Sequence, residues 1–110
     1  MIHVIARFVV RDVAVYAAAH ASFGLDVRQR HGCLASHLYR ERNDAYAMAA
    51  VLTWPSRAAF DAFEVDPVVR DCMRKGGMLA PPVFSAFPDA DLSPETAGAE
   101  GLEKIGDYTG

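Results

Sequence analysis

The segment 45–54 limits the possible folds most, because it predicts a strand that is apolar on both faces. Successive strand side chains point to opposite faces, and here both sets are apolar: Tyr46, Met48, Leu52 and Trp54 on one side, Ala47, Ala49 and Val51 on the other. A strand of this kind must be covered on both faces. The helices of one small domain cover only one of them. A second copy of the chain is the simplest cover for the other, so we expect a face-to-face homodimer.

The segments around this strand predict an α+β fold. Residues 2–10 alternate as a strand, and a helix capped by Asp12 is expected to run to about residue 30. Residues 33–40 and 45–54 form the next two strands, a second helix follows a Ser56 cap, and residues 83–87 form the last strand. A further helical turn or two, capped by Asp66 and Pro67, is expected to close at Gly76 and Gly77. This order is the ferredoxin-like βαββαβ plan with a four-stranded antiparallel sheet.

The charge distribution divides the chain into a domain and a tail. The 110 residues are enough for one domain, and 52% of them are hydrophobic, which argues against disorder over most of the chain. A net charge of −3 excludes a general basic surface for nucleic acid or anionic lipid. Residues 88–110 hold six acidic residues and one basic residue, a net charge of −5. We expect the domain to span 1–87 and the acidic tail, 88–110, to be flexible or to pack on the partner subunit as a short helix.

Cysteine and motif content narrow the remaining classes. Cys33 and Cys72 are too few for a disulfide framework and suit a reducing compartment. No signal peptide and no membrane-length apolar run is evident, so a cytoplasmic protein without a membrane partner is expected. The sequence has no metal-ligand spacing and no flavin or nicotinamide fingerprint, so we expect no cofactor and no metal.

Two pairs of residues could supply acid–base chemistry. Tyr16 and His20 are one helical turn apart and are expected to touch. His37 and Tyr39 share one face of a predicted strand. If that face lines a pocket, His37 is the best candidate for a general base, since histidine is the side chain that ordinarily exchanges its proton near neutral pH. If it is the dimer face, His37 and Tyr39 pack across the interface, and both placements stay open.

Four stretches resemble the antibiotic biosynthesis monooxygenase family of the dimeric α/β-barrel superfamily. They are residues 4–8, 32–40, 52–60 (Leu-Thr-Trp-Pro-Ser-Arg-Ala-Ala-Phe) and 77–84 (Gly-Met-Leu-Ala-Pro-Pro-Val-Phe). The resemblance covers about residues 1–87 and does not extend to the tail. It implies a cleft between helices and sheet that takes a small aromatic or quinol-like substrate.

The resemblance also suggests positions within that cleft. The anthrone-oxidising enzymes of aromatic polyketide pathways use Asn, Trp, Tyr and Arg, which fall here on Ala50, Trp54, Phe60 and Arg70. The Trp and Arg match, whereas the Asn and Tyr do not. The haem-degrading relatives have a His where this chain has Met73, so haem degradation is not expected.

The reaction predicted first is a cofactor-independent oxygenation of an aromatic, polyketide-like metabolite. His37 or His20 would be the base, Arg70 would hold the developing anion and Trp54 would form a dry aromatic wall. Seven further residues are candidates for substrate contact: Tyr16, Phe23, Tyr39, Met48, Ala50, Phe60 and Met73. A non-redox cyclase, isomerase or lyase using the same cleft is the alternative, and a non-catalytic ligand-binding dimer is a third. Oxygen uptake discriminates the first two.

Overall fold

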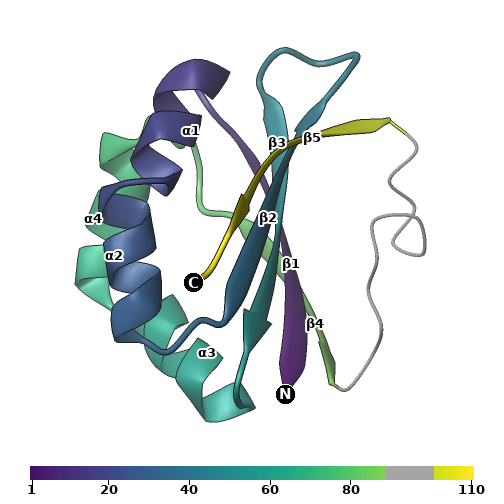
Figure 1. The fold of residues 1–110 in the computed structure, drawn as a ribbon. Helices are drawn as coiled ribbons and strands as arrows, with labels where there is room; N and C mark the ends of the chain where they lie inside the picture. Colours follow the sequence, from purple (N-terminus) through teal and green to yellow (C-terminus); the bar gives the residue numbers. More distant parts are fainter. Residues whose placement is uncertain (89–100) are drawn as a thin grey trace.

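A computed structural model describes residues 1–88 and 101–110, in which helices cover one face of an antiparallel sheet (Figure 1). The strands of this part of the chain are β1 (Ile2–Val9), β2 (Ala35–Glu41), β3 (Ala47–Trp54), β4 (Val83–Pro88) and β5 (Leu102–Tyr108). The helices are α1 (Val13–His20), α2 (Phe23–Arg30), α3 (Arg57–Val65) and α4 (Pro67–Lys75). The α+β prediction is confirmed, with the predicted order of elements kept from β1 to β4.

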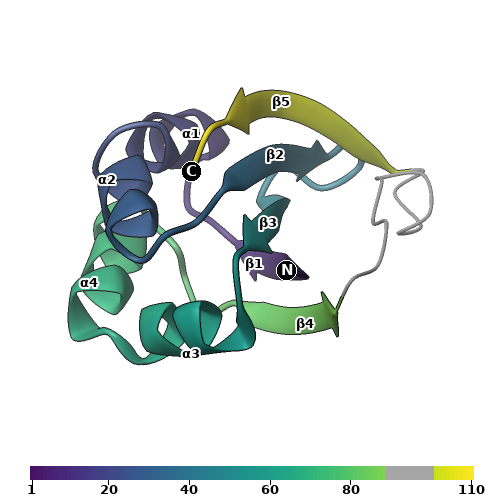
Figure 2. The same ribbon diagram turned by 60° about the horizontal axis from the view of Figure 1, so that its bottom comes forward.

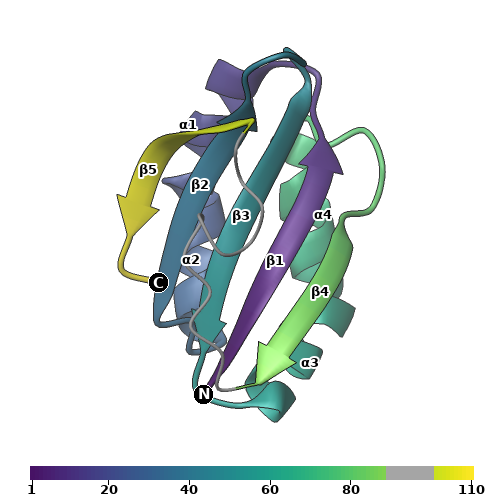
Figure 3. The same ribbon diagram turned by 90° about the vertical axis from the view of Figure 1, so that its right-hand side faces the viewer.

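The sheet has the order β4-β1-β3-β2-β5, which Figure 3 shows face-on with the helices behind it. All neighbouring strands are antiparallel, and Ala6 of β1 lies opposite Ala50 of β3 near the centre. Both residues are buried on the helix side. Their small side chains leave room between the middle of the sheet and the helices above it.

The helix starts follow the capping residues expected from the sequence. Asp12 accepts a hydrogen bond from the Val15 amide, Ser56 accepts one from Ala59, and Asp66 accepts one from Val68. Each cap satisfies one of the amides that the first helical turn leaves without a partner. After α4, Gly77 adopts a φ of 90°, a conformation that favours glycine.

The single helix expected from Asp12 to about residue 30 is wrong, because the chain forms α1 and α2 with a break between them. The Ser22 hydroxyl donates to the carbonyl oxygen of Ala18 at 2.7 Å, at the point where the first helix ends. Gly24 then lies so close to the end of α1 that a Cβ there would be 2.9 Å from the Ala19 oxygen. The chain can therefore turn sharply and place α2 beside α1.

The strand β5 corrects two predictions. The sheet has five strands where four were expected, and residues 102–108 form a strand where a flexible or helical tail was expected. Residues 89–100 of the tail lie outside the described residues. Leu102–Tyr108 pairs with the edge strand β2 of the same chain. The register shifts between Leu38 and Tyr39, so Ile105 has no paired residue. This bulge lets Ile105 and Tyr108 pack on the helix-side core while Leu102 packs on the opposite face.

Both faces of β3 are buried, as its composition predicted. The helix side holds the larger core, which includes Leu38, Trp54 and Phe60, and Figure 2 shows all the labelled helices on that side. The opposite side holds a smaller cluster of four buried residues packed with Leu102: Ile5, Tyr39, Ala49 and Val51. Dimerisation through that side stays a prediction.

In the described ranges 1–88 and 101–110, no helix combines the length and the apolar composition needed to cross a lipid bilayer.

Candidate small-molecule site

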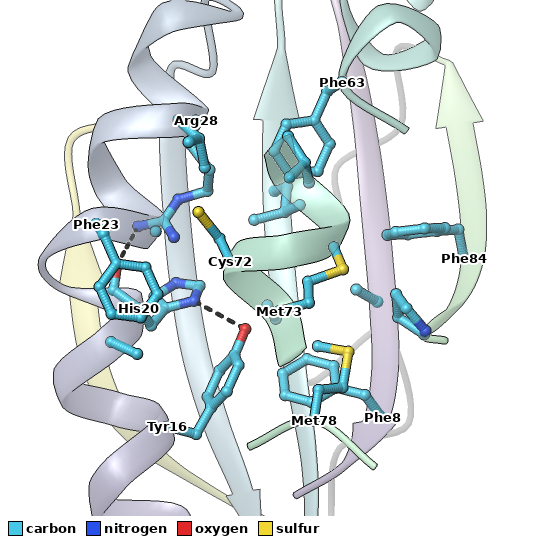
Figure 4. A pocket seen from close by; sticks show the side chains of 18 residues that line it. Phe8, Tyr16, His20, Phe23, Arg28, Phe63, Cys72, Met73, Met78 and Phe84 are labelled. Atoms are coloured by element: carbon cyan, nitrogen blue, oxygen red, sulfur yellow. Dashed lines mark hydrogen bonds between the residues drawn. The ribbon is translucent and has the colours of Figure 1, made fainter. Parts of the chain in front are cut away.

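An apolar cavity lies between the sheet and the helices α1, α2 and α4, and Figure 4 shows its lining side chains. Ala6 and Ala50 form part of its floor on β1 and β3, and Phe23 on α2 lies at its exposed side. The cavity measures about 50 Å³, which is room for a few water molecules. A ring-sized ligand therefore requires some wall side chains to move.

A second hollow of about 240 Å³ adjoins this cavity and shares Met73 and Met78 with it. Arg70, Arg74 and the segment 79–81 complete its lining. Methionine is unbranched and adapts its shape easily. If these two side chains turn aside, the joined space approaches the lower end of small-molecule pockets, about 300 Å³.

Tyr16, His20 and Ser36 form a buried hydrogen-bonded chain at the cavity wall. The Tyr16 hydroxyl lies 3.3 Å from His20 Nδ1, and His20 Nε2 lies 2.8 Å from the Ser36 Oγ (Figure 4 shows the first bond). The i, i+4 spacing on α1 accounts for the first contact, and β2 supplies the serine. Both imidazole nitrogens are thus occupied, so the hydroxyl of Tyr16 is the end of the chain that can meet a ligand.

Burial controls the protonation of this chain. It lowers the pKa of His20 to about 3 and raises the pKa of Tyr16, with the nearby Arg28 cation lowering the His20 value further. Both groups are therefore neutral at pH 7. A neutral imidazole with this pKa and no free nitrogen is a poor base, which argues against the base role expected for His20. It makes His20 a positioning residue for Tyr16.

Lowering the pH from about 6.5 to about 3 is expected to destabilise the protein through His20. Its pKa is lower in the folded state than the ordinary value of 6.5, so the unfolded chain binds the extra proton in this window. One such group changes the unfolding free energy by up to about 1.4 kcal/mol per pH unit. Urea unfolding of wild type and His20→Gln between pH 7 and 4 measures this slope. Equal slopes for the two proteins would contradict it.

Arg28 is the polar residue of the cavity wall that the sequence did not single out. It is only 3% exposed, and its Nε and Nη2 donate to the main-chain oxygens of Gly110 and His20 at 3.1 and 2.9 Å. The sequence suggests only a cation near a helix end, since Arg28 is in the last turn of α2. Gly24, one helical turn before Arg28, is the sequence feature that could have indicated close packing next to the guanidinium.

Five of the predicted site residues line the cavity together: Tyr16, His20, Phe23, Ala50 and Met73. Arg70 does not line it. The Arg70 Nε donates to the carbonyl oxygen of Glu64 at 3.2 Å, and its side chain lines the adjoining hollow. The sequence therefore groups five residues that share this cavity, whereas its predicted cation, Arg70, lies at the neighbouring hollow.

Trp54, Phe60 and Met48 are buried on the helix side but are not part of the cavity wall. The Trp54 ring packs at centroid distances of 4.8 Å from Phe63 and 5.9 Å from Phe60. Phe63 is a cavity residue. Trp54 therefore supports the wall from behind.

The structure settles the open question about His37 and Tyr39, which lie on the sheet face opposite the helices. Tyr39 belongs to the smaller core, and His37 Nδ1 is hydrogen-bonded to Asp107 of β5. That bond is the main reason why the pKa of Asp107 is below its ordinary value. His37 cannot act as a base in the helix-side cavity, because the sheet separates the two.

Within residues 1–88 and 101–110, no three His, Cys, Asp or Glu side chains gather closely enough to hold an ion.

Comparison with known proteins adds one finding. No family model matches the sequence, and no curated protein matches it either. Among solved structures, a crystal structure of an antibiotic biosynthesis monooxygenase superposes with a TM-score of 0.62, covering 83% of this chain and 100% of that chain at 19% identity.

The chain has the fold of an antibiotic biosynthesis monooxygenase. This agrees with the resemblance seen in the sequence and identifies the fold, while the reaction has to be argued from the site. In this chain the cavity between helices and sheet carries Tyr16 and Arg28 as its hydrogen-bonding groups.

Proposed function

We propose that this protein is a cofactor-independent monooxygenase of a small aromatic, polyketide-like metabolite that carries an acidic hydroxyl or enol. The observation that carries the proposal is the Tyr16–His20–Ser36 chain, which ends at the wall of a mostly apolar cavity. The monooxygenase fold supports the choice of reaction class.

The reaction requires only that the protein stabilise the substrate as an anion and exclude water from the cavity. An anthrone-type methylene compound enters as its enolate, whose proton has left to water, and transfers an electron to O₂. The resulting radical pair forms a carbon–oxygen bond, giving a peroxide that loses water. The net reaction is R₂CH₂ + O₂ → R₂C=O + H₂O. All electrons come from the substrate, so no cofactor takes part.

Tyr16 supports the anion in this scheme. When His20 carries its proton on Nδ1, it donates to the Tyr16 oxygen, and the Tyr16 O–H is left to donate into the cavity. A hydrogen bond to an anionic oxygen is stronger than one to a neutral oxygen. In an apolar cavity such a fixed donor stabilises charge more than water does. His20 and Ser36 then act by holding the hydroxyl in place.

Oxygen uptake tests this function. Purified protein with 1,8-dihydroxyanthrone in chelator-treated buffer should consume O₂ faster than the probe's autoxidation, with one O₂ per quinone formed. Heat-denatured protein gives the background rate. Uptake at the background rate, with the probe shown to bind, would contradict the monooxygenase proposal.

The main alternative is a non-redox cyclase, isomerase or lyase. Its support is Ala50, which occupies the cavity where the anthrone oxidisers place an Asn, so one polar group of the oxygenation site is missing. The same Tyr16 hydroxyl would then stabilise an enolate that never meets O₂. Turnover of a β-polyketone substrate without oxygen uptake would favour this reading over the first.

We also propose that the protein is a homodimer joined through the sheet face opposite the helices. Val9, Val83 and Phe87 share that face and are 41%, 68% and 37% exposed. Sedimentation velocity at micromolar concentration should give twice the chain mass. Val83→Asp should shift the protein towards monomer, while Val65→Asp, on the exposed surface of α3, should not. A wild-type monomer would contradict the proposal.

A further inference from the structure

Arg28 is a buried cation at the cavity wall, and its described hydrogen bonds leave its Nη1 group unused. Its side chain is 3% exposed, and its described hydrogen bonds go to two main-chain oxygens, those of His20 and Gly110. Within residues 1–88 and 101–110, no Asp or Glu forms an ion pair with it. Buried charges in proteins are ordinarily paired. A cation held in this way at a cavity wall is suited to receive an anion.

The Nη1 group of Arg28 lies where a ligand could reach it. Neither described hydrogen bond uses Nη1. A Cβ on Gly24 would lie 3.2 Å from Nη1, and both residues line the cavity. The absent side chain of Gly24 therefore keeps the space beside Nη1 open. Figure 4 shows the guanidinium bonded to the main chain at His20, beside the cavity.

The titratable side chains of Tyr16, Cys33 and His20, which lie around Arg28, are uncharged at neutral pH. Burial raises the pKa of Tyr16 and raises that of Cys33 to about 11, so both are uncharged at pH 7. His20 is uncharged as well, because burial lowers its pKa to about 3. The ring of Tyr108, 5.8 Å from the guanidinium carbon, adds only a cation–π contact. The side chains of Tyr16, Cys33 and His20 thus place no negative charge beside the guanidinium at pH 7.

We propose that Arg28 Nη1 binds an anionic oxygen of the ligand, so that the substrate is a small apolar ring compound carrying an ionised hydroxyl or a carboxylate. This deepens the proposed function and rests on it only in taking the cavity as the substrate site. The ligand's ring occupies the apolar space towards Met73, and its anionic oxygen lies between Nη1 and the Tyr16 hydroxyl. A charge-assisted hydrogen bond in a buried site is strong and selects anions over neutral analogues.

Binding of 4-nitrophenol tests the proposal without any turnover, because the ionised dye absorbs at longer wavelength. Bound to wild type, the dye should ionise at a pH at least about one unit lower than in water, as expected beside an opposite charge. Nitrobenzene, which cannot ionise, should bind at least about 10-fold more weakly than nitrophenolate. If the natural ligand carries a carboxylate, 4-nitrobenzoate should bind more tightly than nitrophenolate.

Two variants and one control assign the effect to Arg28. Arg28→Met should abolish the lowered dye pKa and the preference over nitrobenzene, and Arg28→Lys should keep part of both. Arg30→Met, on the same helix but 62% exposed in its side chain, should behave as wild type. If Arg28→Met binds the dye as wild type does, Arg28 is only a structural residue and the proposal is wrong.

The wild-type measurement decides the matter even if Arg28→Met does not fold. An unchanged dye pKa in wild type, equal binding of nitrobenzene, or no binding of either anion at millimolar concentration would each overturn the proposal. A different result is expected if Arg28 binds the anion but the proposed oxygenase function is wrong. In that case the dye pKa is lowered and depends on Arg28, yet 1,8-dihydroxyanthrone gives no oxygen uptake.

Discussion

Replacing Trp54 with alanine is expected to lower the free energy of unfolding by about 3–5 kcal/mol. The indole is completely buried at the end of β3 and packs against Phe60 and Phe63. Removing it takes away apolar contacts and leaves a cavity that neighbours anchored in α3 can fill only in part. Urea unfolding followed by far-UV circular dichroism measures the loss, since the variant has no tryptophan fluorescence.

Two controls separate this effect from a general sensitivity to substitution. Tyr46→Ala removes an aromatic ring that is 57% exposed and should change stability by no more than about 0.5 kcal/mol. Trp54→Phe keeps an aromatic ring in contact with α3 and should cost less than Trp54→Ala. A loss below about 1 kcal/mol for Trp54→Ala would show that the indole is not central to the core.

Tyr16→Phe is expected to lower kcat/KM for oxidation of 1,8-dihydroxyanthrone by about 100-fold or more. The substitution removes the one hydroxyl that the buried chain presents to the cavity, while keeping the ring that packs 4.8 Å from Phe8. It also leaves His20 Nδ1 without its partner, which should cost about 1–3 kcal/mol of stability. Initial rates of oxygen uptake and quinone formation measure the effect.

A stability loss alone must not be mistaken for this effect, so the rates are compared under conditions where both proteins are folded. Ser36→Ala disturbs the far end of the same chain without touching the cavity and should lower the rate much less. Tyr46→Phe should have the wild-type rate, because Tyr46 is exposed and does not line the cavity. A Tyr16→Phe protein that oxidises the probe at the wild-type rate would remove Tyr16 from the mechanism.

The sequence by itself determined the fold class and most of the elements around the cavity, but not the break between α1 and α2. Period-two alternation defines β1, a segment apolar on both faces defines β3, and Asp12, Ser56 and Asp66 are capping residues that start helices where expected. These signals are local, since each depends on residues within one or two turns or on one strand. The contact of Tyr16 with His20 is local in the same sense, because both lie on one helix.

Only the tertiary structure decided which face of the sheet each strand residue meets and how the charges are paired. His37 is the favoured base from the sequence, yet Asp107, seventy positions later, pairs with it on the far side of the sheet. The tail segment has a spacing that suits a helix, but the edge of β2 and a bulge at Ile105 make it a strand. Arg28 was overlooked because its burial depends on α1, α2 and Gly110 meeting at one place. Burial and long-range pairing depend on the whole packed chain, so no local pattern contains them.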